Sequence, residues 1–573
     1  MALAATSSEP SPRWFVSRWW VLTAAIIVQN SAGLTYCFSV YSKDLERLFD
    51  LSERRVTLLG FYCSLGGYLG VVSGLCYDAI ASTYPRVGPR CIFLVGAVLN
   101  FVGYYGLYLA ATGVWDVGFA GLAVLLFTAT NAGTWIDTAA LVTCVNNFPN
   151  SRGYVVGLLK SFVGLSGAVY TVQYEAFLEP DSALFFRFAA ISVSAFVGVA
   201  ALLTNRVSPR ASDKRNKRLR ELGLVDGADI ARRFTISFAC VVLLSAFLCT
   251  ASLLDGLDTH LKKHAKRIIA ACAPLVLIPA VVTFATAEQL FVQCPADAAR
   301  EEDEEESAPE PSTAQEWDPA TPLLEAPSGD YDVRVGAAVL SDGTDAGAPP
   351  AEVPLRRAVL RMDFWLLFTA CFLGMGAGLV YINSLGQYAP SLGASRSTKD
   401  VLVALISVGN ALGRLLGGAI SQISLTRLLV PRTVWLTACA IGATLLNLFL
   451  ATNSSVDLLY PISIVQGLLF GAHWSLMPSI TSELYGLRNF ASNYCALQLA
   501  AALGSFALAQ RMTAALSLDK GGEGECVGVR CYSRVFLANS ALCLVGVVVT
   551  AILIANTRYA YRRIAEEALR KQL

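Results

Sequence analysis

The sequence predicts an all-helical membrane protein that crosses the bilayer about fourteen times. Of its 573 residues, 55% are hydrophobic and 15% are charged, and the mean hydropathy is +0.53. A soluble globular domain carries about 25% charged residues. The apolar residues gather in separate runs of about 20, the length that a helix needs to cross a hydrocarbon core. These observations exclude a soluble enzyme and a collagen-like or disordered chain, and a net charge of +1 argues against a nucleic-acid binder.

Six expected spans follow closely on one another in the first part of the chain. Each must be a helix, because hydrocarbon cannot hydrogen-bond to a bare backbone and the runs lack the alternation of barrel strands. The expected spans are Trp20 to Val40, Val56 to Tyr77, Cys91 to Ala111, Gly118 to Val145, Gly153 to Tyr174 and Leu184 to Leu203.

Two further spans are expected after a basic loop, and a last set of six follows a polar segment. The two extra spans are Phe234 to Leu254 and Ile268 to Val292. The last six are Phe364 to Leu385, Val401 to Ile423, Thr433 to Ala451, Leu458 to Ile480, Phe490 to Gln510 and Val535 to Ala555.

The Lys and Arg residues predict that both chain ends lie on the cytoplasmic side. With that orientation the inner segments hold 27 of the 44 basic residues, the outer loops hold 14 and the spans hold three, as the positive-inside rule requires. The expected organisation is a cytoplasmic tail (1–19), a six-helix bundle (20–203), a basic loop with two extra spans (204–292), an acidic linker (293–362), a second six-helix bundle (363–555) and a basic cytoplasmic tail (556–573).

The segment 293–362 is predicted to be an unfolded cytoplasmic linker. It is rich in Pro, Gly, Ala and acid, with an unbroken acidic run from Glu301 to Glu306, and such a composition cannot bury enough apolar surface to fold. Residues Thr321 to Leu324, which read TPLL, also match a dileucine-type sorting signal for an acidic organelle. A solvated tether is the main expectation, and sorting adaptors are the alternative partners.

Two of the fifteen cysteines, Cys526 and Cys531, fall together in an outer loop. The other cysteines lie in or at the edges of spans, where Cys serves as a small apolar side chain. The spacing CVGVRC suits either a small disulfide-closed turn in an oxidising compartment or two free thiols.

The chain contains an internal repeat. AGLTY begins at Ala32 in the first span, and AGLVY begins at Ala377 in the ninth, an offset of 345 residues. The following span carries three glycines in each half at nearly the same offset, Gly66, Gly70 and Gly74 against Gly409, Gly413 and Gly417. A direct repeat of six-helix halves predicts a rotation axis along the membrane normal and a substrate cavity between the halves.

A motif after the second span resembles the short cytoplasmic signature of the major facilitator superfamily, G-x-x-x-D followed by G-x-R. Gly74, Asp78, Gly88 and Arg90 match it. The resemblance implies a charge latch at the inner end that helps to hold the outward-open state. The corresponding stretch of the second half has Ser421 or Gln422 where the acid would stand, so a second latch is not expected to be complete.

Longer stretches resemble the nodulin-like branch of this superfamily over almost the whole chain. They are WFVSRWWVLTAAIIVQNSAGLTYCFSVYSKDL, ALVTCVNNFPNSRGYVVGLLKSFVGLSGA and CVGVRCYSRVF. Members are similar to fungal vacuolar monocarboxylate-transporter homologues and, more distantly, to oxalate/formate exchangers. The resemblance implies two six-helix halves with two extra spans between them. This chain departs from it at Asp137, where relatives tend to have a polar neutral residue.

Four ionisable side chains lie deep in expected spans: Asp137, Lys160, Arg414 and His473. A charge at a helix centre costs about 2.5 to 3.5 kcal/mol, so such residues are candidates for a cavity. Asp137 lies twelve residues before Pro149 and Lys160 eleven after it. At 1.5 Å per residue both rise about 17 Å from the turn. We therefore expect an ion pair, which either couples substrate or proton binding to movement or only joins two helices.

Each of the remaining candidates has two interpretations. Arg414 serves either as a gate or as a packing residue, and His473 either responds to protons or is buried by packing. Asn30, Asn131 and Asn383 are expected to contact substrate, with contacts between helices as the alternative for each.

The function predicted from these features is secondary transport of a small solute. A small organic anion is the expected cargo, because Lys160 and Arg414 are basic. Metal ions or amino acids are the alternative cargoes, and a non-transporting sensor or scaffold is the alternative function. The chain has no G-x-x-x-x-G-K-[ST] loop for ATP. We expect no enzyme activity, no cofactor and no bound metal, and the expected partners are the substrate, protons and the lipid bilayer.

Overall fold

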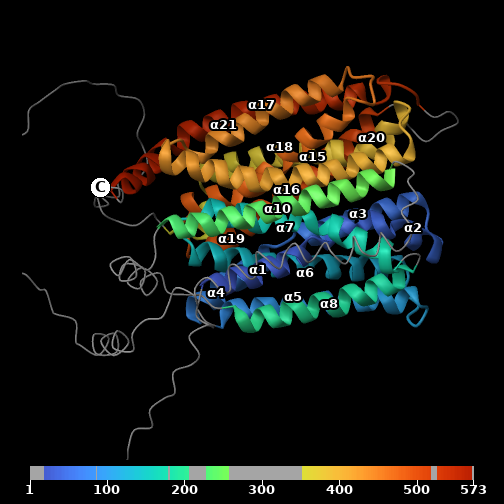
Figure 1. Cartoon of the computed structure of the whole chain (residues 1–573), viewed down its shortest axis with the longest axis horizontal. Coiled ribbons are helices and arrows are strands. Elements are labelled where there is room, and N and C mark those ends of the chain that lie inside the picture. The colour runs from blue at the N-terminus through green and yellow to red at the C-terminus, as the bar shows by residue number, and fades with distance from the viewer. Residues whose placement is uncertain are drawn as a thin grey trace, which may run out of the picture.

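The computed structural model describes residues 18–84, 87–178, 181–204, 227–256, 352–517 and 526–570. Over these residues the chain forms long helices in two bundles that lie side by side. In Figure 1 the N-terminal half, blue to cyan, lies below the C-terminal half, yellow to red. This arrangement confirms the predicted all-helical membrane fold.

The described residues of the N-terminal half form eight α-helices and two short helices of other types. They are α1 (Arg18–Ala32), η2 (Leu34–Cys37), α2 (Phe38–Leu48), α3 (Glu53–Tyr68), α4 (Val71–Thr83), α5 (Gly88–Ala111), α6 (Phe119–Asn147), α7 (Arg152–Gln173), η3 (Tyr174–Leu178) and α8 (Ser182–Leu203).

Between the two halves the described residues include the helix α10 (Gly227–Gly256), and the C-terminal half follows it. Its elements are α14 (Leu355–Ala358), α15 (Met362–Ser391), α16 (Arg396–Arg427), α17 (Arg432–Leu450), α18 (Leu459–Leu484), α19 (Phe490–Gly504), η5 (Ser505–Met512), α20 (Thr513–Leu516) and α21 (Arg530–Arg570).

The described residues contain eleven helices that are long and apolar enough to cross a membrane, or twelve if a bent pair near the N-terminus counts as one. Three differences separate this count from the fourteen predicted spans. The first span is the bent pair, and the expected span Ile268 to Val292 lies outside the described residues. The twelfth predicted span, Leu458 to Ile480, lies in the helix α18. This helix is not among the eleven because it is less apolar and carries buried polar side chains such as Gln466, His473 and Glu483.

Two expected spans are broken beside the centre of the bundle. The first passes from α1 into the short helix η2 at Leu34–Cys37 and then bends by 50° before Tyr41. The second divides into α3 and α4 at Leu69 and Gly70. The amide of Asn131 donates hydrogen bonds to the carbonyls of Gly66 and Leu69, at 3.0 and 2.9 Å. Irregular backbone at membrane depth is tolerated only where it is buried or lines a cavity. The two breaks therefore indicate where a binding site lies.

The two halves meet most closely where α7 packs against α16. A side chain at Gly418 would place its Cβ 2.4 Å from the carbonyl oxygen of Gly153 and 2.7 Å from the Cα of Gly157. Only glycine permits this approach of the two backbones.

The helix α10 packs along the same seam, against both α7 and α16 (Figure 1). Its buried face carries Phe234, Val241 and Leu248, and Phe234 lies 5.6 Å from the ring of Tyr154 on α7. The first of the two extra predicted spans is therefore part of the packed bundle.

Two segment boundaries differ from those expected. The linker expected up to residue 362 has given way to packed structure by residue 352, because Val353 and Ala358 are buried against the C-terminal half. The helix α21 continues to Arg570, through most of the segment expected as a tail.

Candidate functional site

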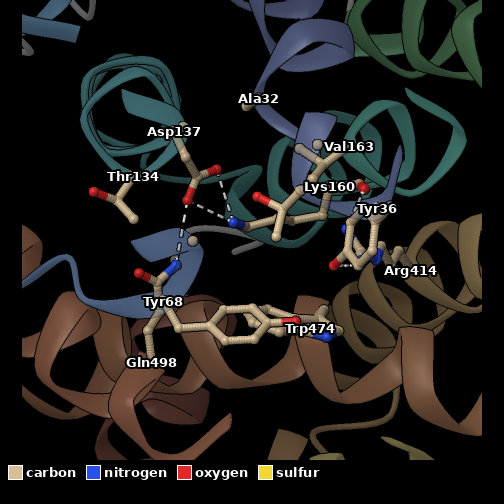
Figure 2. Close-up of a pocket in the computed structure, with 14 residues that line it drawn as sticks. Ala32, Tyr36, Tyr68, Thr134, Asp137, Lys160, Val163, Arg414, Trp474 and Gln498 are labelled. Atoms are coloured by element: carbon tan, nitrogen blue, oxygen red, sulfur yellow. Dashed lines mark hydrogen bonds and ion pairs between the residues drawn. The ribbon is translucent and has the colours of Figure 1, made fainter. Parts of the chain in front are cut away.

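A cavity of about 40 Å³ lies between the halves, next to both helix breaks. It has room for only a few water molecules. Figure 2 shows its lining, which comes from both halves. The lining residues are Ala32, Gly33, Thr35, Tyr36, Gly67, Tyr68, Gly133, Thr134, Asp137, Lys160, Val163, Arg414, Trp474 and Gln498.

Asp137 on α6 and Lys160 on α7 form an ion pair in the wall of this cavity. The Lys160 Nζ lies 2.7 Å from Asp137 Oδ2 and 2.8 Å from Oδ1. The exposed fractions of the two residues are 6% and 3%. The hairpin at Pro149 therefore brings the two charges to one depth, as the equal spacing along the two helices predicts.

The Asp137 carboxylate also accepts hydrogen bonds from both halves of the protein. Gln29 on α1 donates to Oδ1 at 2.9 Å. From α19 in the other half, the Tyr494 hydroxyl donates to Oδ2 at 2.7 Å and the Gln498 amide at 3.3 Å, and both groups also contact one another. Asp137 is therefore a junction between the halves as well as one member of an ion pair.

Arg414 on α16 reaches from the C-terminal half into the N-terminal half. Its NH1 donates to the backbone carbonyl of Lys160 at 2.9 Å, its NH2 to the Tyr36 hydroxyl at 3.0 Å, and its Nε to Asn410 at 3.0 Å. The residue is 1% exposed. No carboxylate of the described residues forms an ion pair with it.

The ring of Trp474 lies beside both cations. The Arg414 guanidinium is 5.5 Å from the centre of this ring and the Lys160 ammonium is 5.8 Å from it. The Tyr68 ring stacks against the indole at 5.5 Å between ring centres (Figure 2). These rings give the cavity an apolar wall that is attracted to positive charge.

His473 and the three candidate asparagines do not line the cavity. The His473 ring faces α15, where a Cβ on Gly374 would lie 2.1 Å from its Nε2, so the structure favours the packing interpretation. Asn131 stabilises the break between α3 and α4, and Asn383 is exposed. Asn30 is half-buried, with its Oδ1 lacking a hydrogen-bond partner in the described part of the chain.

The inner end of the bundle is the end that holds Asp78, the turn at Pro149 and the turn between α18 and α19. There Asp78 Oδ2 accepts a hydrogen bond from the backbone amide of Ser492 at 2.8 Å. Ser492 lies in the first turn of α19, whose own cap residue Asn489 makes no side-chain cap. Asp78 of one half thus caps a helix of the other, and we call this contact the first latch.

Gln422 makes the equivalent contact from the second half. Its Oε1 accepts from the backbone amide of Gly153 at 2.9 Å, in the first turn of α7, where Ser151 makes no side-chain cap. The same oxygen accepts from Arg432 at 2.6 Å, and Arg432 forms a buried ion pair with Glu483, also at 2.6 Å. The motif position without an acid is therefore a second latch, made with an amide.

The other motif residues and the cysteines are placed as follows. A Cβ on Gly74 would lie 2.6 Å from the carbonyl oxygen of Ala491, so glycine lets α4 approach α19 there. Gly88 begins α5, and Arg90 donates to the Thr204 carbonyl at 3.0 Å. Cys526 and Cys531 form a disulfide.

We expect Asp78→Asn to slow uptake into vesicles by about threefold to fivefold while expression stays near normal. A charged cap at a helix N-terminus contributes up to about 1 kcal/mol, and the amide retains only part of it. The measurement is initial uptake rate normalised to protein in the membrane. Loss of the protein from the membrane would instead assign Asp78 to folding.

Sequence reasoning missed Gln29, Tyr68, Tyr494 and Gln498. The one local signal was the spacing of Tyr494 and Gln498, four residues apart on one helix face. Nothing local links them to Asp137, which is more than 350 residues away along the chain.

Comparison with known proteins supports this architecture. The Nodulin-like family matches residues 18–284, and the family described as NFD4, C-terminal domain, matches residues 350–562. Protein NUCLEAR FUSION DEFECTIVE 4 of Arabidopsis thaliana is 26% identical over 572 residues, covering 97% of this chain and 91% of that protein. The probable transporter MCH1 of Wickerhamomyces anomalus is 24% identical over 218 residues, which are 38% of this chain and 42% of that protein.

A solved structure shares the fold at low sequence identity. The proton:xylose symporter XylE of the major facilitator superfamily is 12% identical, with a TM-score of 0.51, over 92% of this chain and 94% of that chain. The chain is therefore a nodulin-like membrane protein with the fold of the major facilitator superfamily.

Proposed function

We propose that this protein carries a small organic anion with a single negative charge across the membrane by alternating access, coupled to a proton. The observation that carries the proposal is Arg414, a cavity residue that is 1% exposed and has no carboxylate partner among the described residues. A buried charge without a partner is strongly unfavourable. An anionic substrate would supply the missing partner.

The charges that line the cavity favour a monoanion over other cargoes. Asp137 contributes one negative charge, and Lys160 and Arg414 contribute one positive charge each, so the lining carries +1. A monocarboxylate brings the loaded site to zero, whereas a dicarboxylate brings it to −1. A zwitterionic amino acid leaves +1, and a divalent metal ion raises it to +3. Because net charge inside a membrane is costly, the monocarboxylate fits best.

Arg414 also has the geometry to bind a carboxylate. A guanidinium carries five N–H groups in a planar fork, and three of them are used by Lys160, Tyr36 and Asn410. Two remain for the two oxygens of a carboxylate, the pairing that this fork makes best. The small cavity and the rings of Tyr68 and Trp474 favour a short acid with an apolar body.

Asp137 supports the coupling to a proton. Its carboxylate attracts Lys160 within one half and Tyr494 and Gln498 across to the other. Either a proton on Asp137 or an anion beside Lys160 would replace one partner of the ion pair and so weaken these charge-assisted hydrogen bonds. Proton and substrate would then change the contacts between the halves, which is what alternating access requires.

Further parts of the proposal rest on sequence and on the relatives. The probable transporter MCH1 supports transport as the activity. The distribution of Lys and Arg supports cytoplasmic chain ends and a cytoplasmic inner end. The acidic linker remains our candidate for contacts with sorting adaptors.

The test is uptake into proteoliposomes with an imposed pH gradient. We expect accumulation of short monocarboxylates, driven by the gradient, and little accumulation of dicarboxylates, zwitterionic amino acids or divalent cations. Specific binding of a monocarboxylate without any flux would instead identify a sensor or scaffold. Flux of another class from this panel would reject the assignment of the cargo.

A further inference from the structure

The turn between α18 and α19 is held by the chain segment that enters the C-terminal half. The backbone amide of Val353 donates to the carbonyl of Tyr485 at 3.0 Å. The carbonyl of Val353 accepts from the side-chain amide of Asn493 at 2.8 Å. This segment therefore binds both the beginning of the turn and the first part of α19.

The Glu352 side chain completes this contact. Its two carboxylate oxygens accept hydrogen bonds from successive backbone amides, Leu487 at 3.3 Å and Arg488 at 2.8 Å. Gly486, which precedes them, has a φ of +79°, and a Cβ there would lie 2.5 Å from a Glu352 oxygen. The turn thus presents two N–H groups to one anion, at a place where a side chain larger than glycine would collide with it.

The same short segment carries the first latch. Ser492, whose amide donates to Asp78, comes only four residues after Arg488. Two carboxylates from different parts of the chain therefore hold the two ends of one segment. Glu352 holds it from the C-terminal half, and Asp78 holds it from the N-terminal half.

We infer that Glu352 is a positioning residue of the first latch, which fixes the start of α19 so that the Ser492 amide faces Asp78. Fixing the backbone of this turn costs conformational entropy, and the hydrogen bonds of Glu352 offset part of that cost before the latch closes. Without Glu352 the turn gains freedom, and the latch is closed for a smaller fraction of the time. This inference rests on the proposed alternating access, in which the latch must open.

A native cysteine reports on the opening of the inner end. Cys495 lies on α19 between the latch residue Ser492 and the cavity residue Gln498. It is fully buried, and its thiol contacts Thr138 at 3.3 Å and Ser73 at 3.9 Å. Separation of α19 from α4 would expose this thiol to a reagent in water.

The experiment measures the rate at which a membrane-impermeant maleimide labels Cys495. The full-length protein is held in lipid nanodiscs, and labelling is followed at that site by peptide mass spectrometry. We expect Glu352→Ala to speed labelling about fivefold, the effect of about 1 kcal/mol for hydrogen bonds to a charged but exposed group. Glu352→Gln, which keeps the shape and one good acceptor, should fall between Glu352→Ala and the native protein.

Two further variants decide whether Glu352 acts through the latch. Asp78→Asn should also speed labelling, and adding Glu352→Ala to it should give little further increase, because both changes open one contact. Asp116→Asn, on an exposed loop of the other half, is the matched control and should leave the rate unchanged. Faster labelling in Asp78→Asn but not in Glu352→Ala or Glu352→Gln would overturn the inference. Labelling needs no substrate, so a failure of monocarboxylate uptake would leave this result standing.

Discussion

Lys160→Ala is expected to abolish monocarboxylate uptake and to lower the stability of the protein. The change removes the ammonium group that lies 2.7 Å from Asp137 and leaves a buried carboxylate without its cation. Breaking a buried ion pair in this way costs about 3–5 kcal/mol. Initial uptake rate and thermal unfolding in detergent measure the two effects. Lys43→Ala, which removes an exposed lysine from the same half, is the control and should change neither.

A second variant separates coupling from simple support of the fold. Asp137→Asn combined with Lys160→Gln removes both charges, keeps groups that can hydrogen-bond and leaves no buried ion without a partner. If the pair couples proton to substrate, the anion should still bind through Arg414 while uptake no longer responds to pH. Uptake at the native rate with an unchanged response to pH would show that the pair only joins α6 to α7.

Helices and depths were predictable from the sequence because they depend on local properties. A run of about 20 apolar residues must be a helix in a bilayer, and counting from Pro149 places Asp137 and Lys160 at one level. The helix breaks were harder to predict from the sequence. Their glycines resemble those that only permit close packing, and the freed carbonyls of Gly66 and Leu69 are satisfied by Asn131 from another helix.

Contacts between the halves could not be predicted, because they join residues hundreds of positions apart. Tyr494 and Gln498 reach Asp137 only because α19 packs against the other half. Gln422 looked like the loss of an acid, yet a helix N-terminus needs an acceptor, which an amide oxygen also provides. For His473 the sequence left two interpretations open, a proton-responsive residue and a packing residue, because it cannot show that the ring faces α15 instead of the cavity.

Arg414→Gln is expected to weaken monocarboxylate binding by about 30-fold or more. Removing one member of a buried, hydrogen-bonded charge pair costs about 2 kcal/mol or more, and here the pair forms between the guanidinium and the substrate. The variant also changes the charge of the lining from +1 to zero, so that a bound monoanion would leave −1 in the membrane. The measurements are the KM for uptake and the Kd for binding to purified protein.

Arg414→Lys distinguishes the charge of this residue from its shape. Lysine restores +1 to the cavity but offers a point charge in place of a planar fork, so binding should recover in part and remain weaker than in the native protein. Arg187→Gln is the matched control, because Arg187 also lies within a membrane span but is exposed and outside the cavity. If Arg414→Gln kept the native KM and Kd, Arg414 would not bind the substrate, and its contacts with Tyr36 and the Lys160 backbone would be structural. A loss of affinity in Arg414→Gln that Arg414→Lys partly reverses, with Arg187→Gln unchanged, is the pattern that an anion-binding guanidinium requires.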